Sequence, residues 1–158
     1  MRDQRGTIQT KGSLNCPKCG YRNAYLERCV GFCCECGTDL SLSDVHWPLS
    51  TIDGANVLFF AWSGATPFFI VPDGGTGRRI FGLAICEYQR HPGVYSFYCD
   101  EQWESQNDML WRTAEEALYE RFSQFDRSRV QWIDYQSGKR WLPDPNHPPG
   151  YNVTQVIR

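Results

Sequence analysis

The chain has 158 residues and a mass of 18.3 kDa, which fits one ordinary domain, or a small module joined to a modest one, and excludes a large multidomain enzyme. Hydrophobic residues make up 41% and aromatic residues 15% of the chain, so it has enough apolar material for a packed core, unlike a disordered polar chain. The formal net charge of −2 excludes a strong overall electrostatic attraction to nucleic acid or to an anionic membrane.

The N-terminus is polar and lacks the apolar stretch of an export signal. It begins MRDQRGTIQTKG, and the longest strongly apolar run in the chain, Val57–Trp62, is far too short to span a bilayer. We therefore expect a cytoplasmic protein that makes no use of a membrane. In a reducing compartment, the eight cysteines favour a metal site over a disulfide framework.

Two Cys-x-x-Cys-Gly motifs are the strongest signal in the chain. They run from Cys16 to Gly20 and from Cys33 to Gly37. The spacing lets both thiolates of a pair face one metal ion, and the glycine permits the positive φ that such a tight turn favours. Four thiolates would complete a closed tetrahedral shell, so the sequence predicts one structural Zn²⁺ rather than a catalytic one.

The stretches CPKCG and FCCECGTDL resemble the short zinc ribbons of bacterial and archaeal proteins, with their CPxCG and FCxxCGxxL motifs. The resemblance covers about residues 13–42. It implies that Cys16, Cys19, Cys33 and Cys36 are the ligands, with Phe32 and Leu40 as hydrophobic supports. Such ribbons are attached to proteins of many functions.

Two further cysteines leave alternatives open. Cys34 lies between two of the expected ligands and Cys29 precedes them, so a Cys34/Cys36 or a Cys29/Cys33 pairing is conceivable. The Cys33/Cys36 frame is favoured because it alone reproduces both the spacing and the position of the glycine. A redox-active Cys-x-x-Cys site would need a surrounding βαβ pattern, which the sequence lacks.

After a linker over residues 43–55, the pattern predicts a second module over residues 56–142. Short runs rich in aromatic and β-branched residues predict antiparallel strands, at Val57–Trp62, Phe68–Val71, Ile80–Tyr88, Val94–Cys99 and Val130–Tyr135. The glycine-rich stretch from Asp73 to Arg78 is expected to be a hairpin turn rather than a phosphate-binding loop, because it joins two strands and does not open a helix.

A helix is predicted after the fourth of these strands. Thr113 and Glu116 form a capping box, and apolar residues then recur at helical spacing as far as Phe125. The second module is therefore expected to be an α+β domain, an antiparallel sheet with one packed helix. Residues 143–158 are expected to form an extended tail. Over about residues 93–133 this module is weakly similar to small, uncharacterised bacterial α+β proteins, a resemblance that implies no activity.

Two groups of residues are candidates for recognition. Asp100 and Glu101, bracketed by Trp103 and Trp111, have the composition of a protein-binding hot spot. In the first module, basic and aromatic side chains alternate in a way that suits phosphate contacts and base stacking; these are Lys18, Tyr21, Arg22 and Arg28.

The sequence thus predicts a non-enzymatic zinc-ribbon protein that acts as a protein-binding or adaptor module. Two alternatives remain. One is an RNA- or ribosome-associated protein that uses the basic and aromatic group, and the other is an immunity-type inhibitor that uses the acidic loop. No catalytic residue and no small-molecule substrate are predicted, because nothing in the sequence orients a nucleophile or a general base.

Overall fold

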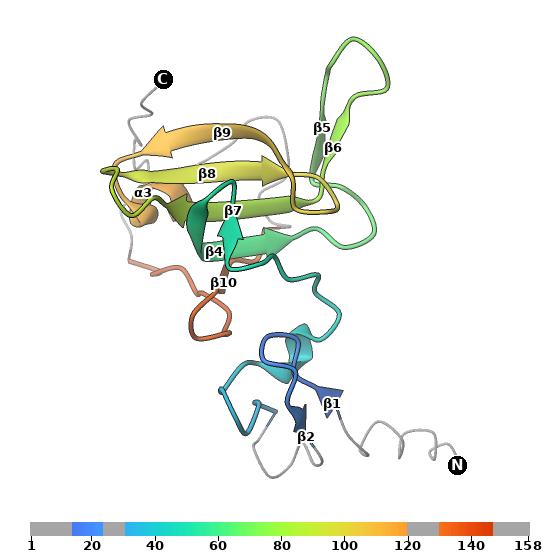
Figure 1. The fold of residues 1–158 in the computed structure, drawn as a ribbon, viewed down its shortest axis with the longest axis vertical. Coiled ribbons are helices and arrows are strands. Elements are labelled where there is room, and N and C mark those ends of the chain that lie inside the picture. Colours follow the sequence, from blue (N-terminus) through green and yellow to red (C-terminus); the bar gives the residue numbers. More distant parts are fainter. Residues whose placement is uncertain (1–13, 24–30, 120–129, 147–158) are drawn as a thin grey trace. The chain divides into compact units, whose positions relative to one another are not determined.

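The computed structural model describes residues 14–23, 31–119 and 130–146 (Figure 1). The chain divides into two compact units. The first, called the cysteine unit below, comprises Met1–Trp47 together with Gln136–Lys139, and the second, the sheet unit, comprises Pro48–Tyr135 and Arg140–Arg158. A short segment far along the chain therefore belongs to the N-terminal unit.

The cysteine unit has little regular structure in its described part. Strand β1 (Leu14–Asn15) pairs antiparallel with β2 (Arg22–Asn23), and a single 3₁₀ turn, η1 (Leu40–Leu42), follows the second Cys-x-x-Cys motif. The Asp39 carboxylate caps this turn by accepting a hydrogen bond from the backbone N–H of Ser41 at 2.9 Å. The hydrophobic cluster around the sulfur atoms in this described part is small, with Cys16, Cys33 and Leu40 as its buried members.

The sheet unit is built around a curled antiparallel sheet (Figure 1). Its strands lie in the order β10-β4-β7-β8-β9, and β3 also pairs with β4. The strands are β3 (Thr51–Ile52), β4 (Ala55–Trp62), β7 (Gly82–Glu87), β8 (Val94–Cys99), β9 (Ser105–Trp111) and β10 (Ile133–Asp134). A separate two-stranded sheet pairs β5 (Phe69–Val71) with β6 (Arg78–Ile80), so the glycine-rich stretch is the predicted hairpin turn.

Both faces of the central strands are buried. All six residues of β8 and five of the six residues of β7 are buried. On one face Leu83, Ile85 and Trp111 pack together with Leu118 of the helix. On the other face Phe60 is fully buried. Burial on both faces explains why these strands are largely apolar, with Ser96 as a buried polar exception.

The helix α3 (Ala114–Tyr119) begins where the capping box predicts. The backbone N–H of Glu116 donates to Thr113 Oγ1 at 3.1 Å, as expected for an N-cap threonine. The Glu116 carboxylate in turn accepts from the backbone N–H and the guanidinium of Arg112. The remaining part of the predicted helix, which includes Phe125, lies outside the described residues.

The predicted α+β class is wrong, because the regular structure of the described residues is mostly strand and their helix has only six residues. Part of the error lies at Ser105–Trp111, which forms β9 although its sequence SQNDMLW contains few strong strand formers. Pairing with β8 from Cys99↔Ser105 to Val94↔Trp111 makes it a strand. Strand propensity depends on such neighbours more than on the segment itself.

Candidate metal centre

Each Cys-x-x-Cys-Gly motif folds into a tight turn around its first sulfur atom. In the first turn the backbone N–H groups of Lys18 and Cys19 point to Cys16 Sγ at 3.4 and 3.5 Å. Gly20 N–H donates to the carbonyl oxygen of Cys16 at 3.0 Å, with a φ of +79° at the glycine. The positive φ predicted for this glycine is confirmed, and a β-carbon there would strain the turn.

The second turn repeats this geometry. Gly37 has a φ of +80°, and its N–H donates to the carbonyl oxygen of Cys33 at 2.8 Å. Two similar turns therefore present two sulfur atoms each.

The four sulfur atoms meet in one cluster. Cys16 Sγ lies 3.6 Å from Cys36 Sγ, and Cys19 Sγ lies 3.7 Å from Cys33 Sγ; all four atoms lie within 4.8 Å of one another. A tetrahedral ion with metal–sulfur bonds of about 2.3 Å requires sulfur–sulfur separations of roughly 3.8 Å. The cluster therefore has the dimensions to hold a single metal ion.

Of the two cysteines that left alternatives open, the structure describes only Cys34. The cluster contains Cys33 and Cys36 but not Cys34, and Cys29 lies outside the described residues. Of the expected hydrophobic supports, Leu40 packs with Cys16 and Cys33 in a small core. Phe32 is instead 38% exposed.

Two buried polar side chains lie beside the cluster, and the sequence analysis predicted neither of them as part of the site. Asn23 is 1% exposed; its amide nitrogen donates to the Tyr21 carbonyl at 3.1 Å and approaches Cys33 Sγ at 3.5 Å, and its oxygen accepts from Cys34 N–H at 2.8 Å. Thr38 is fully buried, with Oγ1 3.1 Å from Cys36 Sγ. Such partners orient metal ligands and tune their charge.

These hydrogen bonds shift the pKa values of the cluster. Burial by itself raises the pKa of Cys33, but N–H donors, led by the Cys36 backbone and the Asn23 amide, lower it to about 6. Burial acts the same way on Cys36, but the hydroxyl and N–H of Thr38 lower its pKa below the usual value. Desolvation and the neighbouring sulfur atoms raise the pKa of Cys19. The second turn thus favours thiolates, the form that binds metal.

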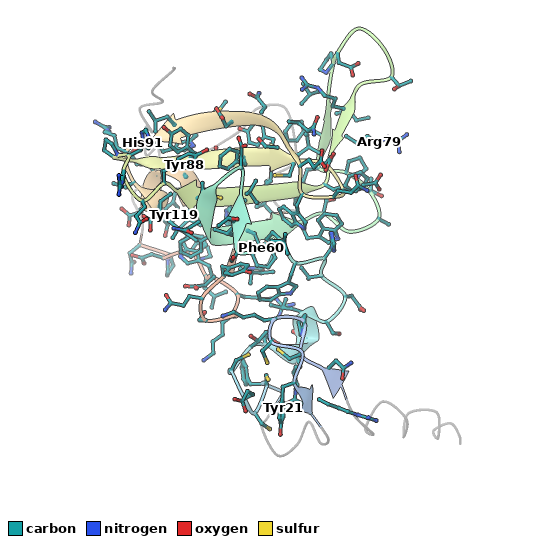
Figure 2. All side chains as sticks on the ribbon, in the orientation of Figure 1. Tyr21, Phe60, Arg79, Tyr88, His91 and Tyr119 are labelled. Atoms are coloured by element: carbon teal, nitrogen blue, oxygen red, sulfur yellow. The ribbon has the colours of Figure 1, made fainter. Side chains whose placement is uncertain are left out.

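The residues proposed for nucleic-acid contacts have varied surroundings. The Lys18 ammonium donates to the carbonyl oxygen of Gln136. Tyr21 is 45% exposed and lies at the periphery of the cysteine unit (Figure 2). Arg22 is exposed in β2, and Arg28 lies outside the described residues. The Lys18 side chain is therefore engaged within the cysteine unit.

The aromatic pair predicted for partner binding is not presented on the surface. Trp103 is 7% exposed and Trp111 1% exposed, and the Trp111 indole N–H donates to Ser96 Oγ at 2.8 Å. Asp100 orders the loop by accepting N–H groups of two loop residues. Of Asp100, Glu101, Trp103 and Trp111, only Glu101 is exposed. The two tryptophan rings are too buried to form a binding surface.

The glycine-rich turn uses its own carboxylate where a phosphate would bind. Asp73 Oδ1 accepts the backbone N–H groups of Gly75 and Gly77, each at 3.0 Å. A cleft of about 330 Å³ beside the turn is lined by residues of both charges, among them Arg79 and Glu101. The turn therefore satisfies two of its own N–H groups, which supports the structural interpretation made from the sequence.

Comparison of the chain with protein-family models, curated proteins and solved structures finds no match. Among the described residues, no helix is both long enough and apolar enough to cross a membrane.

Proposed function

We propose that the protein is a non-enzymatic, zinc-stabilised protein-binding module. The observation that carries the proposal is the cluster of four cysteine sulfur atoms, of which two pairs are 3.6 and 3.7 Å apart. Soft thiolate ligands in tetrahedral geometry select zinc or iron–sulfur centres. Separations this short suit one ion rather than a multinuclear cluster, and this favours zinc.

The metal in this proposal is structural. Four protein thiolates fill all four positions around Zn²⁺ and leave none for water or substrate. In small zinc-binding peptides the metal contributes about 10–16 kcal/mol of folding free energy. The cysteine unit, whose buried core around the sulfur atoms is small, would rely on that contribution. A reducing compartment would keep the thiols available, so the proposal includes a cytoplasmic location.

Exposed aromatic side chains in the cysteine unit favour a protein partner. Tyr21 and Phe32 are 45% and 38% exposed, and aromatic residues are enriched in protein interfaces. The net charge of −2 supplies little attraction to RNA, and Lys18 is already hydrogen bonded to Gln136. We therefore favour a protein surface over RNA as the partner.

Metal analysis of the purified protein tests the first half of the proposal. We expect one zinc per chain, and we expect Cys36→Ser to lose it. Cys86→Ala is the matched control, because Cys86 is a free cysteine of β7 outside the cluster, and should keep the metal. Full zinc retention in Cys36→Ser, or iron in place of zinc, would contradict the assignment.

Affinity purification from the native host, with and without ribonuclease, tests the second half. We expect a stoichiometric protein partner that survives ribonuclease, binds the purified chain directly, and is lost from Tyr21→Ala while that variant keeps its zinc. Partners that disappear on ribonuclease treatment would replace the proposal with the RNA-associated alternative.

A further inference from the structure

The segment Gln136–Lys139 is the tip of a hairpin whose two sides belong to the sheet unit. The two sides are joined by an antiparallel bridge between Ile133 and Arg140 and by a hydrogen bond from Trp141 N–H to the carbonyl oxygen of Trp132 at 2.9 Å. The tip itself belongs to the cysteine unit. This unit is therefore assembled from two parts of the sequence about a hundred residues apart, a separation long enough that loop-closure entropy opposes it.

The tip makes its closest approach at Gly138. The Gly138 carbonyl accepts a hydrogen bond from Asp39 N–H at 3.0 Å. Gly138 is buried and has a φ of +72°, and a β-carbon added to it would lie 2.2 Å from Thr38 Oγ1 and 2.9 Å from Thr38 Cα. Only glycine fits against this threonine without displacing it.

Thr38 connects this contact to the sulfur cluster. Its side-chain oxygen lies 3.1 Å from Cys36 Sγ, and its carbonyl accepts the N–H of Cys33 at 2.8 Å. Any shift of Thr38 therefore disturbs two of the four cysteines at once.

Two more contacts join the tip to the cysteine turns. The Lys18 ammonium, from within the first turn, donates to the Gln136 carbonyl. The Lys139 ammonium lies 5.3 Å from the ring centroid of Phe32, the residue before the second turn, within the range of a cation–π interaction. The tip thus contacts the surroundings of both turns.

We propose that Gln136–Lys139 is a positioning element of the metal site, and that Gly138 acts on metal affinity through Thr38. The inference rests on the proposed metal-binding function and extends it beyond the N-terminal residues that contain all four cysteines. The N-terminal motifs then hold zinc at full affinity only when the distant tip is in place. Loss of a group that orients a metal ligand typically weakens metal binding by about 10- to 100-fold.

The test is the zinc affinity of full-length Gly138→Ala, measured by competition with a chromophoric chelator. We expect a dissociation constant raised about tenfold or more. Gly64→Ala is the matched control, because Gly64 has a φ of +87° and would place its β-carbon more than 4 Å from any neighbour; it should leave zinc affinity within twofold. Protection of the buried Cys86 and Cys99 from a thiol reagent shows that the sheet unit is folded.

Substitutions of Thr38 separate a positioning role from a general loss of fold. Thr38→Ser keeps the hydroxyl beside Cys36 and should bind zinc nearly as the wild type does, whereas Thr38→Ala should bind it more weakly. If Gly138 acts through Thr38, the losses in Gly138→Ala and Thr38→Ala are less than additive in the double variant.

The outcomes also separate this inference from the proposed function. Zinc affinity of Gly138→Ala equal to that of Gly64→Ala, or strictly additive losses in the double variant, would overturn the inference and leave the metal site standing. A wild-type chain that holds no zinc would overturn both.

Discussion

Replacing Asn23 with alanine should weaken zinc binding by about 30-fold. The side chain makes three contacts within the cysteine unit: to the Tyr21 carbonyl at 3.1 Å, to the Cys34 N–H at 2.8 Å and to Cys33 Sγ at 3.5 Å. A net contribution of about 1 kcal/mol for each of the two shorter bonds gives about 2 kcal/mol. At about 1.4 kcal/mol per tenfold change, this corresponds to about 30-fold.

The loss should appear in metal affinity because folding of such a small unit is coupled to metal binding. When the metal-free unit is unfolded, the free energy of forming its hydrogen bonds is part of the apparent binding free energy. Competition with a chromophoric chelator at fixed pH measures that quantity directly. Asn56→Ala, at an exposed position in β4, is the matched control and should not change it.

A second substitution isolates the contact to sulfur. Asn23→Asp keeps an oxygen that can accept the Cys34 N–H, but it places a carboxylate where the amide faces Cys33 Sγ. Repulsion between the carboxylate and the thiolate should make this variant bind zinc no better than the alanine variant. Tighter binding by Asn23→Asp than by Asn23→Ala, or wild-type affinity in Asn23→Ala, would refute this account of the site.

Other predictions concern stability and reactivity. Removing zinc with a strong chelator should abolish amide-exchange protection in the two cysteine turns. Protection of the amides in β7 and β8 should persist, since the sheet unit has its own buried core. Simultaneous loss of amide protection in β7 and β8 would contradict this prediction. Burial raises the pKa of Cys86 and Cys99, so both thiols should stay protonated and unreactive toward an alkylating reagent at pH 8 until denaturant is added; rapid labelling of the native protein would contradict this. Ser96→Ala, which leaves the buried Trp111 indole N–H without its acceptor, should lower the free energy of unfolding by about 1–3 kcal/mol in a denaturant titration, and an unchanged midpoint would count against it.

Local signals in the sequence accounted for the parts of the molecule that depend on near neighbours. The turns at Gly20 and Gly37 take the positive φ that their motifs predict. The helix begins with the hydrogen bond between Thr113 and Glu116 expected from the capping box. In each case the interacting groups lie within a few residues of one another, so spacing alone determines the geometry.

The fold class and the exposure of the aromatic residues could not be obtained in this way. Strand β9 forms because its backbone pairs with β8, although its own sequence resembles a loop. Trp103 belongs to the group predicted for partner binding, yet its ring lies against Gly82, where an added β-carbon would be 2.4 Å away. Both outcomes depend on segments distant in sequence, whose pairing no local pattern encodes.

The metal site shows the same division. The sequence by itself determined which cysteines could share a metal ion, because two residues between thiolates and a glycine after them already define each turn. Only the tertiary structure brought Gly138 against Thr38 and buried Asn23 beside Cys33. These contacts join residues with no characteristic spacing, and they form only when a distant hairpin tip and a short strand pack around the sulfur atoms.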